Sequence, residues 1–135
     1  LAKIGGRPLG LALDAGGDII TCVAGMGLER VTMAGKVTLL ADQTSRTLIS
    51  VRDDRTIRMA DDLDIAPDGV ICFTDATRRY DIENLGMDLL EVRPNGRLLA
   101  HDPKSGKTRT VCDNLNFPNG VCVTHDGRHL LVANS

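Results

Sequence analysis

The sequence predicts an all-β fold, and a repeated pattern of strands and turns is the main evidence for it. Each of three segments contains an alternating apolar strand, a turn with glycine and a second apolar strand. These segments are residues 8–24, 61–76 and 118–135. Their turn glycines are Gly17, Gly69 and Gly127, which lie 52 and 58 residues apart. Repeats of about this length in an all-β chain are typical of the blades of a β-propeller.

The turns of the hairpins have a simple chemical basis. Asp68 precedes glycine in the sequence PDG, and Asp126 precedes glycine in HDG. Glycine adopts a positive φ without steric cost, and an aspartate carboxylate accepts hydrogen bonds from backbone N–H groups close to it in the chain. We therefore predict that Asp68 and Asp126 form turns. The strands beside them alternate between apolar and polar residues, as half-buried antiparallel strands do.

Two further candidate strands follow each of the first two hairpins. They cover residues 28–33, 36–42, 96–103 and 107–114. Four antiparallel strands per unit is the composition of a propeller blade. The third unit has two strands before Ser135, so the chain is predicted to hold about two and a half blades. As one partial propeller over residues 1–135, it would comprise a blade at about 6–42, a blade at about 59–114 and the first half of the next blade at 115–135.

Two inserts interrupt the repeats. Residues 43–58 are polar and charged, so we expect a long connection between blades. Residues 81–91 place apolar residues at three- and four-residue spacings, which predicts a short amphipathic helix with Asp81 as its N-cap. This helix would either pack on the edge of a blade or act as a lid at the mouth of the pocket.

Composition narrows the classes of function. Apolar residues make up 42% of the chain and charged residues 25%, which is ordinary for a soluble globular protein. The net charge of −2 predicts no broad basic surface for nucleic acid, and the 2% aromatic content offers no platform for stacking bases. No apolar run approaches the length of a membrane span. The chain starts at Leu1 rather than Met, so we expect its natural start to be missing and leave its compartment open.

The cysteines and histidines show no recognised ligand spacing. Each cysteine is isolated among apolar neighbours, so we expect buried free thiols rather than a zinc site. The cysteines are Cys22, Cys72, Cys112 and Cys122. His101, His125 and His129 are expected to have surface or turn roles.

Three short motifs carry a resemblance to a known family. They are DDLD, GRLL-x-x-DP and FPNG, and they occur in this order between residues 61 and 120. With them, the chain from about residue 5 to 135 resembles the strictosidine synthase-like family, which belongs with the gluconolactonase, regucalcin and paraoxonase-type propellers. The resemblance implies that the chain is a segment of a six-bladed β-propeller, with a central pocket where the inner strands begin.

The resemblance also implies a site at that pocket. In the metal-dependent branches, one calcium-like ion is held by oxygen ligands from several blades. Asn119 in FPNG matches a metal-binding asparagine, and Asp61 in DDLD matches a position where relatives carry an asparagine that contacts metal or substrate. Asp61 and Asn119 are therefore the candidate metal ligands, and Asp61 and Asp62 are the candidate substrate-binding residues. The matching residue of the first blade is Leu9, so that blade is expected to contribute no ligand.

The same residues have a scaffold interpretation. Asp61, Asp62 and Asp64 would then cap strand ends and form hydrogen bonds between blades, and Asn119 would be a turn residue before Gly120. Calcium takes about six to eight oxygen ligands, so two side chains are too few and several blades must converge on the ion. Aspartate in place of asparagine adds a charge, which would strengthen a site for a hard cation and repel an anionic substrate.

The resemblance implies a metal-dependent hydrolase that acts on lactones or related esters, with calcium as the divalent metal and a small molecule as substrate. Two alternatives stay open. One is a metal-free condensing enzyme of the strictosidine synthase type, and the other is a non-catalytic propeller binding module. No catalytic residue is assigned within the chain, and the segment alone is expected to be inactive. Exposed blade edges would allow copies of the chain to associate.

Overall fold

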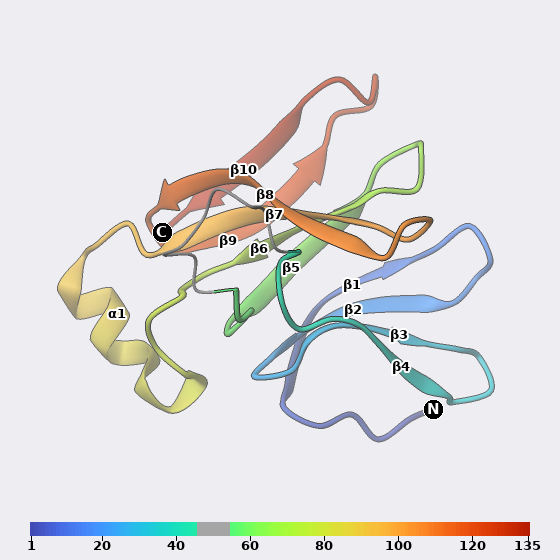
Figure 1. Cartoon of the computed structure of the whole chain (residues 1–135), viewed down its shortest axis with the longest axis horizontal. Helices are drawn as coiled ribbons and strands as arrows, with labels where there is room; N and C mark the ends of the chain where they lie inside the picture. The colour runs from blue at the N-terminus through green and yellow to red at the C-terminus, as the bar shows by residue number, and fades with distance from the viewer. Residues whose placement is uncertain (46–54) are drawn as a thin grey trace.

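The strands form two four-stranded antiparallel sheets and one two-stranded hairpin (Figure 1). The structure, a computed structural model, describes residues 1–45 and 55–135. The first sheet, here called blade 1, contains β1 (Arg7–Leu13), β2 (Ile19–Ala24), β3 (Gly27–Val31) and β4 (Val37–Ala41) in that order. The second sheet, blade 2, contains β5 (Ala60–Ile65), β6 (Ile71–Asp75), β7 (Gly96–Asp102) and β8 (Lys107–Leu115) in that order. The hairpin, the half-blade, pairs β9 (Pro118–Val123) with β10 (Leu130–Asn134). The predicted partial propeller of two and a half blades is confirmed.

The hairpin turns use the predicted chemistry. Gly69 has a φ of 89° and Gly127 a φ of 68°, which are values that favour glycine. The Asp68 carboxylate accepts a hydrogen bond from the N–H of Val70 at 3.0 Å. The Asp126 carboxylate accepts one from the N–H of Arg128 at 3.1 Å. Both aspartates are therefore turn formers, as the sequence predicts.

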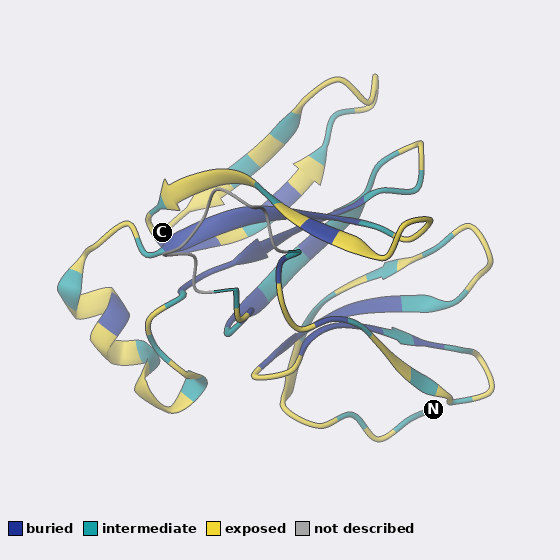
Figure 2. Cartoon of the chain, viewed as in Figure 1, coloured by how far each residue is buried: buried dark blue, intermediate teal, exposed yellow. Residues whose placement is uncertain are grey.

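The apolar core lies between blade 1 and blade 2. Figure 2 shows that buried residues concentrate on the middle strands β2, β3, β6 and β7. The alternation of the strands turns one apolar face of each sheet toward the other sheet. The buried apolar cluster at this interface comprises Ile20, Cys22, Leu28, Ala41, Ile57, Ala60, Leu63, Ile71, Phe73 and Leu99.

Two predictions about single residues are wrong in part. Cys22 and Cys72 are buried free thiols as predicted, but Cys112 and Cys122 are exposed, because strand alternation turns their side chains away from the packed face. His101 is buried rather than on the surface, because β7 is covered on both faces. Its Nδ1 atom lies 2.9 Å from the hydroxyl of Thr108, and burial lowers the pKa of the imidazole.

The connection between β6 and β7 contains the predicted helix. A 3-10 turn (Ile82–Asn84) leads into α1 (Leu85–Glu91). Asp81 occupies the N-cap position of the 3-10 turn but forms no capping hydrogen bond, so this detail of the prediction is wrong. Its carboxylate instead lies 3.5 Å from the guanidinium group of Arg58.

The helix lies at the end of the blades where the inner strands begin. Its buried side chain is Asp88, whose carboxylate accepts hydrogen bonds from Thr77 and Asn95, both at 2.8 Å. Ile82 and Leu85 pack against a small apolar cluster that joins the starts of the three inner strands. This cluster comprises Leu9, Ala24, Met59, Ala76 and Phe117. The helix is thus held at the pocket end, and its action as a lid stays a prediction.

A buried ion pair fixes the segment that enters β5. Arg97 and Asp75 lie on adjacent strands at paired positions, with 2.9 Å between guanidinium and carboxylate and no exposure of either side chain. The other Asp75 oxygen accepts the N–H of Met59 at 2.9 Å, and Arg97 donates to the carbonyl of Thr56 at 2.8 Å. Burial raises the pKa of Asp75, and the charge of Arg97 opposes that shift. The pair therefore holds the backbone just before β5 against blade 2.

Residues 46–54 of the predicted connection at 43–58 lie outside the described residues.

Replacing one member of this pair should destabilise the protein strongly. Arg97→Met leaves a buried carboxylate without its cation, so we expect a loss of about 3–5 kcal/mol in the free energy of unfolding. Arg97→Met combined with Asp75→Asn removes both charges and should recover part of this loss. Urea unfolding measures both effects.

The partly exposed pair of Arg79 and Glu91, 3.4 Å apart, provides the matched control. Arg79→Met should cost less than about 1 kcal/mol, because solvent screens this pair. Equal costs for Arg97→Met and Arg79→Met would contradict the role of the buried pair.

Candidate functional site

The three inner strands begin with the same irregularity. The antiparallel register shifts between residues 8 and 11 of β1, between 60 and 63 of β5, and between 118 and 121 of β9. In each strand, two residues face a single residue of the partner strand, which is the arrangement of a β-bulge. The first bulge residues are Leu9, Asp61 and Asn119, and the second are Gly10, Asp62 and Gly120. The candidate ligands thus occupy equivalent positions in successive repeats.

Glycine at the second bulge position of β1 lets blade 1 approach blade 2 closely. A Cβ atom on Gly10 would lie 2.7 Å from the Cα of Asp62 and 2.9 Å from the carbonyl oxygen of Asp61. These distances are shorter than any contact that a real Cβ makes with backbone. Gly10 therefore permits β1 to lie directly against the residues of the candidate site.

Two carboxylates of β5 join blade 2 to the half-blade. Asp62 Oδ2 accepts a hydrogen bond from the N–H of Val121 at 3.0 Å, and Asp64 Oδ2 accepts one from the N–H of Val123 at 2.7 Å. Asp62 and Asp64 lie two residues apart, so their side chains leave the same face of β5. These bonds are those of the scaffold interpretation. Substrate binding by Asp62 stays a prediction.

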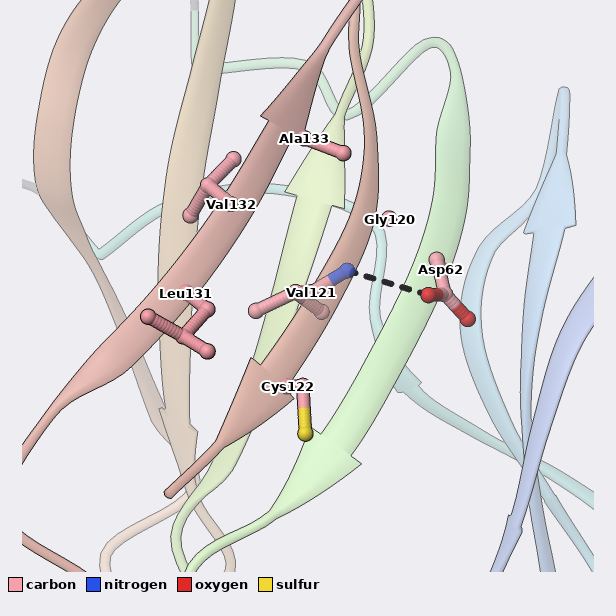
Figure 3. A pocket seen from close by; sticks show the side chains of 7 residues that line it. All are labelled: Asp62, Gly120, Val121, Cys122, Leu131, Val132 and Ala133. Atoms are coloured by element: carbon pink, nitrogen blue, oxygen red, sulfur yellow. Dashed lines mark hydrogen bonds between the residues drawn. The ribbon is translucent and has the colours of Figure 1, made fainter.

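A hollow of about 340 Å³ lies beside Asp62 (Figure 3). Its other lining residues are Gly120, Val121, Cys122, Leu131, Val132 and Ala133. Figure 3 shows the Asp62 carboxylate directed at the N–H of Val121 at one side of this apolar hollow. Asp61 and Asn119 are not among the lining residues, so the hollow lies on the face of the half-blade and is separate from the candidate metal ligands.

Asp61 has an available carboxylate in a partly buried position. Within the described ranges 1–45 and 55–135, no donor forms a hydrogen bond with this carboxylate. Burial and the neighbouring charge of Asp62 raise the pKa of Asp61 to about 6, and Arg7 opposes the shift. Burial, together with the charges of the same two carboxylates, raises the pKa of the Cys22 thiol well above its usual value. Among the described residues, Arg7 is the cation whose charge acts on Asp61, and it does not offset the effects of burial and of Asp62.

Asn119 offers an amide side chain on the next inner strand. The side chain is exposed, and its backbone carbonyl accepts a hydrogen bond from the hydroxyl of Thr74 at 2.8 Å. The structure thus places Asp61 and Asn119 at the starts of neighbouring inner strands with side-chain oxygens available. Leu9, at the equivalent place in blade 1, packs in the apolar cluster and offers no ligand atom.

The donor set fits part of the coordination sphere of a hard cation. Carboxylate and amide oxygens are the ligands that calcium prefers, but calcium takes about six to eight of them. Among the residues that the structure describes, no three His, Cys, Asp or Glu side chains converge on one point. His125 and His129 lie in an exposed turn at the opposite end of β9, and His101 lies in the core. Asp61 and Asn119 therefore stay the candidate ligands, and no cluster of three such side chains among the described residues completes a site around them.

Reasoning from the sequence did not identify two groups that shape this site. Thr74 and the Asp75–Arg97 pair are fully buried beside the strands that carry Asp61 and Asn119. The signal in the sequence was the polar pair TD at the end of the apolar run VICF. Polar residues that follow a buried strand so directly need partners, and only the fold shows which partners they have.

The chain is similar to known proteins over most of its length. A family profile described as strictosidine synthase matches residues 61–135. The protein strictosidine synthase-like 7 of Arabidopsis thaliana is 36% identical over 128 residues, which cover 94% of this chain and 32% of that protein. The adipocyte plasma membrane-associated protein of Danio rerio is 30% identical over 130 residues, which cover 95% of this chain and 30% of that protein. The chain spans about a third of the length of these curated relatives.

Solved structures share the fold. A gluconolactonase from Xanthomonas campestris superposes with a TM-score of 0.67 at 21% identity, covering 95% of this chain and 40% of that one. A second structure, described as a gluconolactonase, has a TM-score of 0.70 at 23% identity and covers 95% of this chain and 41% of that one. At these identities the similarity establishes the fold alone.

No helix within the described residues is long and apolar enough to cross a membrane.

The raised pKa of Asp61 predicts a pH dependence of stability. The native pKa of about 6 exceeds the ordinary value of 3.8, so the native state binds this proton more tightly than the unfolded state does. The contribution of the Asp61 proton to the free energy of unfolding is therefore complete below about pH 4 and is lost as the pH rises through about 6. Asp61→Asn should remove this loss, so the variant should gain stability relative to wild type between pH 4 and pH 7.

Unfolding by urea at a series of pH values measures the effect. Asp68→Asn, at an exposed turn carboxylate, is the control and should follow the wild-type pH profile. A wild-type profile in Asp61→Asn would show that Asp61 titrates normally.

Proposed function

The chain belongs to the strictosidine synthase family, and we propose that it forms part of a metal-dependent hydrolase that acts on lactones or related esters. The observation that carries this proposal is the placement of Asp61 and Asn119. They begin successive inner strands at equivalent bulge positions, and each has a side-chain oxygen that no described residue occupies. The gluconolactonase structures, which share the fold, make a lactone the natural substrate class to test.

The metal that we propose is calcium. Asp61 supplies a carboxylate and Asn119 an amide oxygen, both hard donors that suit this ion. The charge of Asp62 beside Asp61 adds to the negative potential that would attract a cation. Because two ligands are too few for calcium, the remaining ligands would come from water and from polypeptide outside these residues.

The proposed chemistry divides between the ion and the protein. A bound calcium ion would polarise the substrate carbonyl and stabilise the negative charge that develops on its oxygen. Asp61 and Asn119 would hold the ion at the pocket end of β5 and β9. Asp62 uses one oxygen for the N–H of Val121, and its other oxygen would accept a hydrogen bond from a substrate hydroxyl. The carboxylates of Asp61 and Asp62 would favour a neutral, hydroxylated substrate over an anionic one.

A metal-free condensing enzyme is the second candidate, and the match to the strictosidine synthase profile favours it. In that case, Asp61 would contact the substrate directly, and calcium would have no effect. A non-catalytic binding module would retain the fold and show neither metal binding nor turnover.

In any of these roles, copies could associate through exposed apolar residues of β1, where Leu11 and Leu13 are 65% and 68% exposed.

Calcium titration by calorimetry tests the leading proposal. The full-length protein should bind calcium, and Asp61→Ala and Asn119→Ala should each abolish measurable binding, because each removes an oxygen ligand. Thermal unfolding should show that both variants keep the fold, since neither side chain forms a hydrogen bond with a described residue.

Asp68→Asn is the matched control, because it changes a carboxylate of the same blade that lies in a turn. It should bind calcium as the wild type does. Unchanged calcium affinity in both Asp61→Ala and Asn119→Ala would refute the metal assignment. Absence of binding by the wild type would favour the condensing enzyme or the binding module.

A further inference from the structure

We propose that Thr74 is a positioning residue that sets how Asp61 and Asn119 lie relative to each other. The inference rests on the proposed function, because it concerns the same two candidate ligands. Thr74 lies on β6 and has no exposed surface. Its hydroxyl binds backbone groups, so its effect on the site would pass through the backbone of its neighbours.

The hydroxyl of Thr74 connects the two strands that carry the ligands. It accepts a hydrogen bond from the N–H of Asp62 at 3.1 Å and donates one to the carbonyl of Asn119 at 2.8 Å. A threonine hydroxyl has one proton, so it can serve both partners only by accepting from one and donating to the other. The backbone groups beside Asp61 and at Asn119 are thus joined through a single oxygen atom.

The bulges explain why this hydroxyl is needed. On β5, Ala60 pairs with Asp75 and Leu63 pairs with Phe73, so Asp61 and Asp62 together face Thr74. On β9, Pro118 pairs with Asn134 and Val121 with Val132, so Asn119 lies within the second bulge. Residues in a bulge lack the regular ladder bonds that fix a strand. The Thr74 hydroxyl provides a substitute bond to both bulges at once.

The other bonds between blade 2 and the half-blade act further along the strands. Asp62 and Asp64 bind the N–H groups of Val121 and Val123, which lie beyond the bulge of β9. They hold the two blades together but form no hydrogen bond with the backbone of Asn119. Of the side-chain bonds between β5–β6 and β9 in the described residues, the one from Thr74 reaches Asn119 itself.

The repeats supply an internal comparison. The residue that faces the bulge is Cys22 in blade 1, Thr74 in blade 2 and Ala133 in the half-blade. A thiol is a weak donor and alanine has none, so a strong hydroxyl donor stands at this place in one of the three repeats. That repeat is the one whose bulge carries Asp61 and which borders the bulge that carries Asn119. Blade 1, which has the cysteine, presents Leu9 instead of a ligand.

The test removes the hydroxyl and then restores it. Thr74→Val keeps the shape of the side chain without the hydroxyl, and Thr74→Ser keeps the hydroxyl. Thr108→Val is the matched control, because it removes another buried hydroxyl of blade 2, one that contacts His101 at 2.9 Å. The full-length protein and the three variants are compared by calcium calorimetry and by the NMR signals of the Asn119 side-chain amide.

Thr74→Val should weaken calcium binding by about 10- to 100-fold, as changes to groups that orient metal ligands usually do. It should also shift the Asn119 amide signals. Thr74→Ser should restore both, and Thr108→Val should match the wild type in both. A general loss of stability would affect Thr74→Val and Thr108→Val alike, so it would not produce a difference between them in calcium affinity or in the Asn119 signals.

The outcomes separate this inference from the proposed function. If the wild type binds no calcium, the proposed function fails, and the Asn119 signals decide the inference: a shift in Thr74→Val that Thr74→Ser reverses supports it. Unshifted signals in Thr74→Val overturn the inference. Where the wild type binds calcium, a calcium affinity of Thr74→Val equal to that of Thr108→Val overturns it as well. If Thr74→Val does not fold, Thr74→Ala is compared with Thr108→Ala in the same two measurements, and equal results overturn the inference.

Discussion

Blade 2 and the half-blade share no backbone ladder, so side chains must join them. β5 pairs with β6, and β9 pairs with β10. Between them, the carboxylates of Asp62 and Asp64 take the places that backbone carbonyls would have in a continuous sheet. Each binds an N–H group of β9 that would otherwise lack a partner. Because both the side chains and the N–H groups recur at a spacing of two residues, the two bonds fix the register of one blade against the next.

The same constraint explains the crowding of aspartates between residues 59 and 76. That segment contains five aspartates, and the structure gives them different partners. Asp68 forms a turn, Asp62 and Asp64 join blades, and Asp75 pairs with Arg97 in the core. Asp61 is the one of the five whose carboxylate binds no described residue, and burial and the neighbouring charge of Asp62 raise its pKa. One residue type thus performs scaffold tasks at four positions and leaves a carboxylate without a described partner at the fifth.

The position of the candidate site follows from how the inner strands begin. A bulge interrupts each ladder at the pocket end, which frees two residues per strand from regular pairing. Such residues can direct side chains toward a ligand, but they need other contacts to stay in place. Those contacts come from buried polar groups behind the bulges. Arg97 and Asp75 hold the segment before β5, and the hydroxyl of Thr74 reaches both β5 and β9. These buried polar groups therefore support the backbone that carries the candidate site.

The sequence by itself determined the local features of this protein. Alternating apolar residues and the glycine turns specified the strands, the hairpins and the division into two and a half blades, because each of these depends on neighbours within a few residues. The same local signal specified the short helix. It could not show that the carboxylate of Asp81 pairs with Arg58 instead of capping the helical segment.

Only the tertiary structure decided which polar side chains have hydrogen-bond partners within the described protein and which have none. Asp61, Asp62 and Asp64 are alike in sequence, but the bonds of Asp62 and Asp64 span 59 residues. The burial of His101 and of Thr74 could likewise not be predicted from the sequence, because the partner that makes it favourable lies on another strand in each case. The cost of a buried polar group depends on that partner, and the partner is chosen by the packing of one sheet on another rather than by local sequence.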